Sequence, residues 1–298
     1  MAIKSPFQNS SSRWVRYSRY EYRKMPDGVL YLTPTEKSES SVYDPLSDAE
    51  TMVLDALNIG MLCMRGSPDE ELIQSEVHYF VEKYGLLGFI TALPTTPDFM
   101  NYDTVYLPPN RYVRNEHMAV RDYTALFFPF QDDDSYNDVN PKKHYIGDDG
   151  SMRVSLAAKD KPQAVEISYQ KGYSERYDWL RKQFKDWAFS FCASFMYYDE
   201  PDPLMQELHR KAMSAFDGIA PTYHIELFKK PTLIWDFHSL LLALQMMFSY
   251  MLTDDEKPLR SCRHCTKAFL AGHSQSAFCS PQCKNKYNVY KSRFKDKE

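Results

Sequence analysis

Four of the six cysteines lie close together near the C-terminal end of the sequence. Cys262, Cys265, Cys279 and Cys283 follow the pattern C-x2-C-x13-C-x3-C. Zinc in structural sites prefers four thiolate or imidazole ligands in a tetrahedron, and each short cysteine pair can supply one edge of it from a tight turn. The spacing therefore predicts a zinc site formed by these four thiols.

Other chemistries for the same cysteines are less well supported by the surrounding sequence. Two unrelated reduced turns are one alternative, and a thioredoxin-like redox pair would need a βαβ pattern that these residues lack. An iron–sulfur cluster would also take four thiolates. His264 or His273 could replace a cysteine ligand, but we expect an all-cysteine site, with Phe269 and Phe278 packed beneath the metal.

Charge is distributed unevenly along the 298 residues. Residues 257–298 hold ten Lys and Arg against two Asp and Glu, a balance of +8, which leaves 26 against 38, or −12, for residues 1–256. A basic C-terminal segment suits a polyanionic partner, whereas an acidic remainder does not. A solvated basic surface with no ligand is the alternative.

The basic segment also has helical periodicity. Steps of 100° per residue place Cys283, Tyr287, Tyr290 and Phe294 on one stripe, which predicts a helix that begins near Ser280 and packs on the finger or the body. Basic residues lie along both flanks of this stripe, and the outer face between the flanks holds Asn285, Asn288 and Ser292. We expect nucleic acid to contact Lys284, Asn285, Lys286, Asn288, Lys291, Arg293 and Lys295.

These residues carry a family resemblance that covers about the last forty residues. The segments Cys262-Arg-His-Cys265 and Phe278-Cys-Ser-Pro-Gln-Cys-Lys-Asn-Lys286, with Phe269 between them, resemble the C-terminal zinc fingers of bacterial CGNR-type proteins. The resemblance implies a bacterial DNA-binding transcriptional regulator with its finger behind a larger mixed domain. The family's Cys-Gly-Asn-Arg reads Cys283-Lys-Asn-Lys286 here.

The rest of the chain predicts an α+β fold, a mostly helical body with short strands, ahead of a treble-clef-like four-cysteine finger. We expect a flexible arm at 1–12, a body at 13–256 that could divide near 131–150, and the finger at 257–298. The 43% of hydrophobic residues is ample for a core.

The local patterns predict individual elements of this body. A β-hairpin is expected within 14–32 around the turn Pro26-Asp27-Gly28, and a polar linker at 37–46. A capping box at Ser47 and Glu50 should open the first helix. The expected helices are 47–64, 68–84, 115–127, 174–198, 203–216 and 233–251, and the expected strands are 104–107, 163–169 and 223–228.

No catalytic motif with convincing spacing is present in the sequence. The best remaining candidates are two pairs, His224 with Glu226 on a strand, and Asp236 with His238, which would diverge on a helix. We therefore expect no enzymatic activity and assign no catalytic residue. The acidic segment 131–150 is expected to be a solvated loop rather than a cation site.

The sequence leaves three classes of function open. The first is a nucleic-acid-binding regulator, with DNA favoured over RNA and a body that senses a ligand or forms a homodimer. The second is a protein-interaction or defence-system component whose finger docks a protein partner. The third is an enzyme with a site assembled from distant residues. Because no apolar leader or membrane span is apparent, we expect a cytoplasmic protein.

Overall fold

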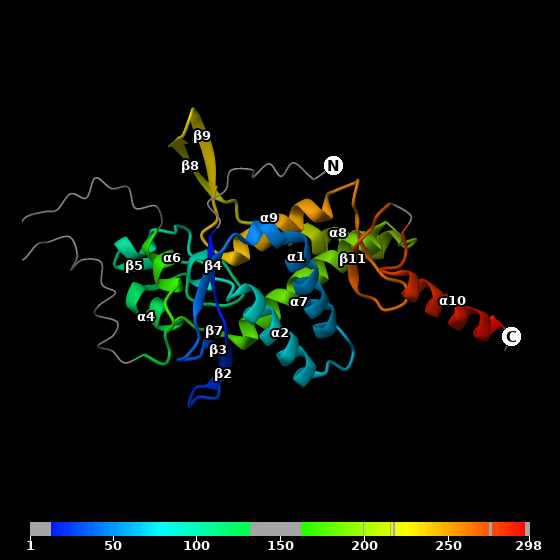
Figure 1. The fold of residues 1–298 in the computed structure, drawn as a ribbon, viewed down its shortest axis with the longest axis horizontal. Coiled ribbons are helices and arrows are strands. Elements are labelled where there is room, and N and C mark those ends of the chain that lie inside the picture. The colour runs from blue at the N-terminus through cyan, green and yellow to red at the C-terminus, as the bar shows by residue number, and fades with distance from the viewer. Residues whose placement is uncertain are drawn as a thin grey trace, which may run out of the picture. The chain divides into compact units, whose positions relative to one another are not determined.

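The computed structural model describes residues 13–131, 162–198, 200–214, 216, 218–273 and 276–295. The predicted arm at 1–12 and nearly all of the acidic segment 131–150 fall outside these residues. Within them the fold is mixed α+β, as expected, with helices and short antiparallel strands (Figure 1). None of the described helices is long and apolar enough to cross a membrane.

The described strands form small antiparallel sheets. Their pairings are β1–β4, β2–β3–β7, β5–β6, β8–β9 and β10–β11. Their bounds are β1 Trp14–Tyr17, β2 Tyr20–Lys24, β3 Leu30–Pro34, β4 Ser40–Tyr43, β5 Thr104–Tyr106, β6 His117–Ala119, β7 Glu175–Arg176, β8 Thr222–Leu227, β9 Pro231–Asp236, β10 Leu259–Ser261 and β11 Ala268–Leu270.

Helices make up most of the remaining regular structure. Short 3-10 turns occur at η1 Pro45–Asp48 and η2 Phe99–Asn101. The α-helices are α1 Ala49–Cys63, α2 Glu70–Tyr84, α3 Phe89–Ala92, α4 Val120–Ala125, α6 Gln163–Ser168, α7 Tyr177–Tyr197, α8 Pro203–Ser214, α9 Leu240–Leu252 and α10 Pro281–Lys295.

The chain divides into two compact units, each built from three separate segments. Unit 1 comprises Met1–Leu46, Val81–Leu180 and Pro221–Ala243. Unit 2 comprises Ser47–Phe80, Arg181–Ala220 and Leu244–Glu298. The four cysteines thus share a unit with α1. The boundary that we expect at 256/257 concerns independent folding, which compactness does not test, so it stays a prediction.

A buried carboxylate lies at the centre of unit 1. Glu175 is fully buried, and its Oε1 accepts hydrogen bonds from the backbone N–H groups of Gly88 (2.6 Å) and Phe89 (2.9 Å) and from the Tyr173 hydroxyl (2.6 Å). Its Oε2 accepts from the N–H of Leu87 at 2.8 Å. Burial raises the pKa of the Glu175 carboxyl, and these four donors offset part of the rise.

Gly88 is the residue that allows three consecutive amides to face one carboxylate. Its φ of +79° lies in the left-handed region that favours glycine. A Cβ there would lie 2.6 Å from the Trp14 ring and 2.8 Å from the Cβ of Ser239. An aromatic cluster surrounds the loop and includes edge-to-face contacts of Phe89 with Tyr112 and Trp179.

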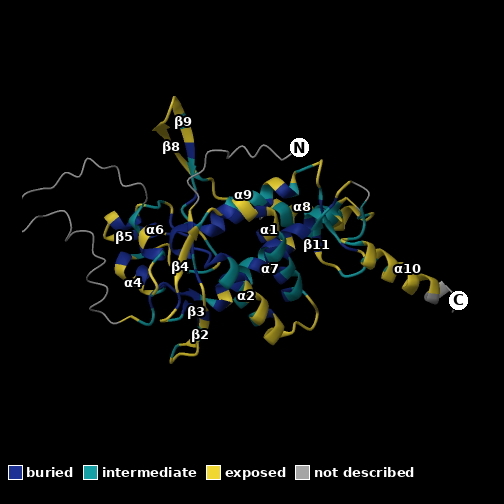
Figure 2. Ribbon diagram, in the orientation of Figure 1, coloured by how far each residue is buried: buried dark blue, intermediate teal, exposed yellow. Residues whose placement is uncertain are grey.

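Unit 2 depends on close helix packing. A Cβ on Gly60 of α1 would lie 2.0 Å from the backbone oxygen of Phe184 in α7, so only glycine allows this approach. Phe184 is fully buried and makes an edge-to-face contact with Phe80 of α2, with ring centroids 4.9 Å apart. In Figure 2, the dark blue that marks buried residues appears on these helices.

Several predicted elements are confirmed. β2 and β3 form the expected hairpin around Pro26-Asp27-Gly28, with Gly28 at a φ of +92°. The strands at 104–107 and 223–228 and the helix at 203–216 occur with shifts of one or two residues at their ends. The aromatic residues Tyr177, Phe184, Trp187 and Phe191 of α7 are buried and recur at helical spacing.

The prediction of a strand at 163–169 is wrong, because Gln163–Ser168 form helix α6. Glu166 is exposed on it. The buried positions recur at helical spacing and are Ala164, Val165, Ile167 and Ser168. A short window with one polar residue in the middle fits both periods, and tertiary burial decided between them.

The start predicted for the helix at 233–251 is too early. Pro231–Asp236 instead form β9, which pairs with β8, and α9 begins only at Leu240. The residues Thr232, Ile234 and Trp235 are β-branched or aromatic, which favours a strand once a partner strand is present.

The predicted helix starts also need correction. α1 begins at Ala49 with Asp48 at the N-cap position, whereas the expected capping box placed Ser47 there. α2 begins at Glu70 rather than 68, because the Asp69 carboxylate accepts the N–H of Leu72 at 3.1 Å.

Two further segments contain strands that periodicity missed. The polar linker expected at 37–46 holds β4, which pairs with β1. The helix expected at 115–127 is β6 followed by the short helix α4, because β6 pairs with β5. The helix expected at 174–198 begins at Tyr177, after β7.

We expect Glu175→Gln to lower the free energy of unfolding by about 1–3 kcal/mol, because an amide NH2 would replace one acceptor and leave a buried N–H without a partner. Urea unfolding followed by tryptophan fluorescence measures this, since Trp14 and Trp179 are buried in unit 1. Glu166→Gln on the exposed side of α6 is the control and should stay within about 0.5 kcal/mol of the parent. Equal stability of the two variants would contradict the role given to this carboxylate.

Candidate metal centre

The four cysteines are positioned by a strand end, a turn and a helix start. Cys262 directly follows β10, and Cys265 lies in the turn that leads to β11. Cys279 precedes α10, and Cys283 lies in the first turn of that helix. Two short elements thus present two thiols each, as the spacing of the sequence predicts.

Backbone hydrogen bonds fix the turn between the first two cysteines. The Cys262 N–H donates to the Lys267 carbonyl at 2.9 Å, and the Thr266 N–H donates to the Cys262 carbonyl at 2.8 Å. Thr266 has a φ of +62°, in the left-handed region. This tight turn keeps Cys262 and Cys265 on the same side of the β10–β11 hairpin.

A capped helix start fixes the second pair. The Ser280 hydroxyl accepts the N–H of Cys283 at 3.2 Å, and Pro281 occupies the first helical position. Both features are typical of helix N-termini. The helix start near Ser280 that the sequence predicts is therefore confirmed, and it orients Cys283 toward the other thiols.

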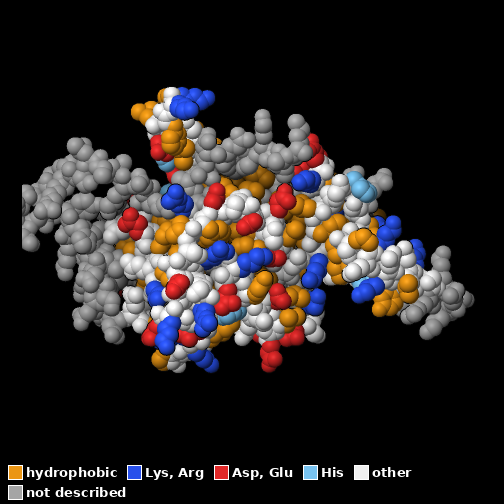
Figure 3. Space-filling model, viewed as in Figure 1, with side chains coloured by type: hydrophobic (Ala, Val, Ile, Leu, Met, Phe, Trp, Pro, Cys, Tyr) orange, Lys and Arg blue, Asp and Glu red, His pale blue; other side chains and the backbone are white. Residues whose placement is uncertain are grey.

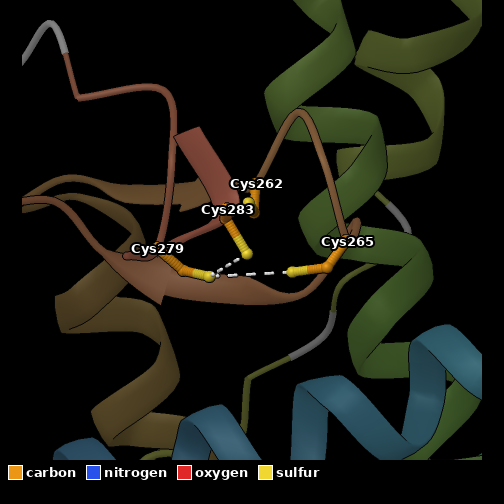
Figure 4. A group of neighbouring side chains, drawn as sticks. All are labelled: Cys262, Cys265, Cys279 and Cys283. Carbon is orange, nitrogen blue, oxygen red and sulfur yellow. Dashed lines mark hydrogen bonds between the residues drawn. The ribbon is translucent and has the colours of Figure 1, made fainter. Parts of the chain in front are cut away.

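The four sulfur atoms lie within 4.8 Å of one another (Figure 4). The Cys279 Sγ is 3.6 Å from that of Cys265 and 3.5 Å from that of Cys283. Disulfide sulfurs are about 2.05 Å apart, so these are free thiols. A tetrahedral metal site with metal–sulfur bonds of about 2.3 Å requires sulfur separations near 3.8 Å. The cluster could therefore hold a metal ion.

The thiols influence one another electrostatically. Burial acts to raise the pKa of Cys262, but hydrogen bonds from the backbone of Cys265, Cys279 and His264 outweigh it and lower the pKa to about 6. Burial, followed by hydrogen bonds with Cys283 and Cys265, raises the pKa of Cys279 to about 12. Cys262 therefore loses its proton readily, and its negative charge disfavours ionisation of Cys279. A bound cation would stabilise several thiolates at once.

The two histidines near the cysteines lie outside the sulfur cluster. Among the described residues, the group that could hold a metal here contains the four cysteines alone. The His264 ring stacks on Tyr290 of α10 at 5.9 Å. Phe278 contacts Tyr287 of the same helix at 5.2 Å. Of the stripe that the sequence predicts on α10, Tyr287 is half-buried, whereas Tyr290 stacks on His264 but remains 55% exposed.

The module is also tied to α1 of the same unit. The side-chain amide of Asn58 accepts the Ala268 N–H at 2.9 Å and donates to the Ala268 carbonyl at 3.5 Å. Asn58 thus pairs with β11 much as a neighbouring strand would. The sequence did not predict this contact. One indication was available, because a polar residue that lies between Leu57 and Ile59 in an apolar helix needs a hydrogen-bond partner.

The predicted nucleic-acid contacts lie on α10. The exposed ones whose side chains the structure describes are Lys284, Asn285, Lys286, Asn288 and Lys291. Arg293 and Lys295 belong to the last helical turn, whose side chains lie outside the described part. The structure places these residues together on one helix.

The polar pairs considered for catalysis are arranged differently from expectation. His224 Nδ1 lies 2.7 Å from the Asp236 carboxylate across the β8–β9 hairpin, and His238 Nε2 lies 2.6 Å from the Thr222 hydroxyl. Asp236 and His238 were expected on a helix, but Asp236 ends β9 and His238 follows it.

No family model, no curated protein and no solved structure matches this chain.

We expect freshly purified protein to contain about one metal ion per chain, and Cys279→Ser to lose it, because a hydroxyl is a poor substitute for a thiolate. Elemental analysis measures the metal. Trypsin should then cut faster after Lys284, Lys286 and Lys291, because α10 loses its anchor. Cys192→Ser, a cysteine outside the cluster, is the control and should keep the metal. A metal-free parent would contradict the site.

Asn58→Ala should loosen the metal module without removing the metal, because it deletes both hydrogen bonds to Ala268 but no ligand. One buried backbone N–H then lacks an acceptor, at a cost of about 1–3 kcal/mol. Hydrogen exchange at the Ala268 amide should accelerate, as mass spectrometry or NMR can show. The matched variant Thr51→Ala, on the exposed side of α1, should leave exchange unchanged. Equal exchange in both would show that Asn58 does not anchor β11.

Proposed function

We propose that this protein binds nucleic acid through α10, which is held in place by a zinc ion on Cys262, Cys265, Cys279 and Cys283. The observation that carries the proposal is the exposed basic surface of a helix whose first turn is part of the sulfur cluster. Lysine and arginine side chains appear along the segment that includes α10 in Figure 3.

Zinc is the metal that an all-sulfur tetrahedral set favours, and it acts structurally by linking the β10–β11 turn to the start of α10. The arrangement of a cysteine turn, a hairpin and a helix that carries the last cysteine supports a treble-clef-like finger. This small module lacks a hydrophobic core of its own. Four metal–sulfur bonds would therefore fix the orientation of α10.

The described basic residues flank the aromatic stripe of α10. Tyr287 contacts Phe278 and Tyr290 stacks on His264, and the exposed lysines lie beside these two rings. Lys284 and Lys291 are seven residues apart and share one flank, and Lys286 lies on the other. Side chains of this kind neutralise phosphates. Asn285 and Asn288 lie between the flanks, where an amide could pair with an adenine edge.

The charge distribution supports the same assignment. The segment 257–298 has a balance of +8, whereas residues 1–256 have −12. An acidic remainder is repelled by a polyanion, so we assign binding to the finger and a sensing or dimerising role to the rest of the chain. The resemblance to CGNR-type fingers favours DNA as the ligand and transcriptional regulation as the role.

A salt titration of binding to duplex DNA tests the proposal. Neutralisation of roughly three to five phosphates predicts a slope of about −3 to −4.5 for log K against log salt. Lys284→Gln, Lys286→Gln and Lys291→Gln together should reduce the magnitude of the slope by about 2–3. Fluorescence anisotropy on the full chain, with matched RNA duplex as a second ligand, measures both.

The control removes positive charge from exposed lysines of unit 1. Lys24→Gln with Lys37→Gln should leave slope and affinity unchanged. An unchanged slope in the triple variant would show that α10 is not the contact. Absence of binding to DNA and RNA at low salt would instead favour a finger that docks a protein.

A further inference from the structure

The β8–β9 hairpin has one entirely apolar side. Its register pairs Tyr223 with Trp235, Ile225 with Leu233 and Leu227 with Pro231. Successive residues of a strand point to opposite faces, so these six side chains share one face. The opposite face carries Thr222, His224, Glu226, Thr232, Ile234 and Asp236.

The apolar side contains no buried residue, whereas the opposite side has one. Every residue of β8 is exposed (Figure 2), with Ile225 at 66% and Leu227 at 78%. Ile234, on the opposite side, is only 6% exposed. The hairpin therefore buries part of its mixed face and presents its apolar face to solvent, the reverse of an ordinary surface hairpin.

Such a hairpin is poorly stabilised by itself. Among the described residues no third strand pairs with β8 or β9. A two-stranded hairpin is marginally stable in water, and an apolar surface of this kind marks an interaction site. This face is therefore a candidate interaction surface.

We propose that the hairpin of a second copy of this chain covers it, the two apolar faces packing together about a two-fold axis. The four large exposed side chains of this face, Tyr223, Ile225, Leu227 and Leu233, range from 42% to 78% exposed. With side-chain areas of about 150–250 Å², two copies would bury on the order of 1,000 Å², the lower bound for a specific interface.

Charge selects how the two hairpins align. The tip between the strands carries the exposed Lys229 and Lys230. Parallel hairpins would bring four lysines together, which costs energy. Antiparallel hairpins keep the two pairs of lysines apart. An antiparallel arrangement about a two-fold axis therefore buries both apolar faces without bringing like charges together.

The proposal does not rest on nucleic-acid binding, because the hairpin belongs to unit 1 and the cysteines to unit 2. If both proposals hold, a dimer carries two linked fingers. Linked contacts raise the effective concentration of the second finger at the polymer, so a small module reaches useful affinity.

Sedimentation velocity on the full chain tests the proposal, with dimerisation expected in the micromolar range. Ile225→Lys and, separately, Leu227→Lys should each weaken dimerisation by about tenfold or more, because either buries a charge in the interface. Because all of β8 is exposed, these changes should leave the far-ultraviolet circular dichroism of the chain unchanged.

Glu226→Lys is the matched control, since it places the same side chain at the adjacent position on the opposite face. It should leave the dissociation constant within about twofold of the parent. A parent that stays monomeric at about 100 µM overturns the proposal, whatever other protein the face might take up. Equal weakening by Glu226→Lys and Ile225→Lys also overturns it, because the apolar face would then have no special role.

Discussion

Unit 1 depends on the hydrogen bonds that one buried carboxylate accepts from the backbone of Leu87, Gly88 and Phe89. Each of these N–H groups is remote from water and would be costly without an acceptor. Glu175 supplies the acceptor from β7, which itself pairs with β3. The carbonyl groups of the same loop accept further hydrogen bonds. The Leu86 carbonyl accepts one from the Trp14 indole N–H, and the Leu87 carbonyl accepts one from the Leu241 N–H. The loop thus joins segments that are far apart in the sequence.

Unit 2 uses α1 for two separate contacts. Gly60 lets the backbone of α7 approach closely, and Asn58, two residues earlier, hydrogen-bonds both backbone groups of Ala268 in β11. The cysteine module therefore has two supports, a set of four thiols and one side-chain amide. The amide fixes the hairpin from outside, whereas the thiols fix the turn and the helix start. A metal at the thiols would thus orient α10 on a base that is already held.

Two exposed surfaces remain that the cores of the units do not use, and they differ in the physical force that would bring a partner. α10 presents lysines and amides, which suit a long-range, salt-dependent attraction to phosphate. The β8–β9 hairpin presents Ile225, Leu227 and other apolar side chains, which suit a short-range contact that excludes water. The interior chemistry is different again, since the buried Glu175 is held by hydrogen bonds from three backbone N–H groups and the Tyr173 hydroxyl.

The sequence by itself determined those features that depend on neighbours within about twenty residues. The cysteine spacing, the cap of α10 at Ser280 and the turn at Gly28 are local, because short-range geometry and residue type are sufficient for them. Tertiary structure decided what depends on distant partners. β9 is a strand rather than a helix because β8 pairs with it, and Gln163–Ser168 is a helix because one of its sides is buried. Asn58 meets Ala268, 210 residues away, and Glu175 meets Leu87, 88 residues away, which no periodicity encodes.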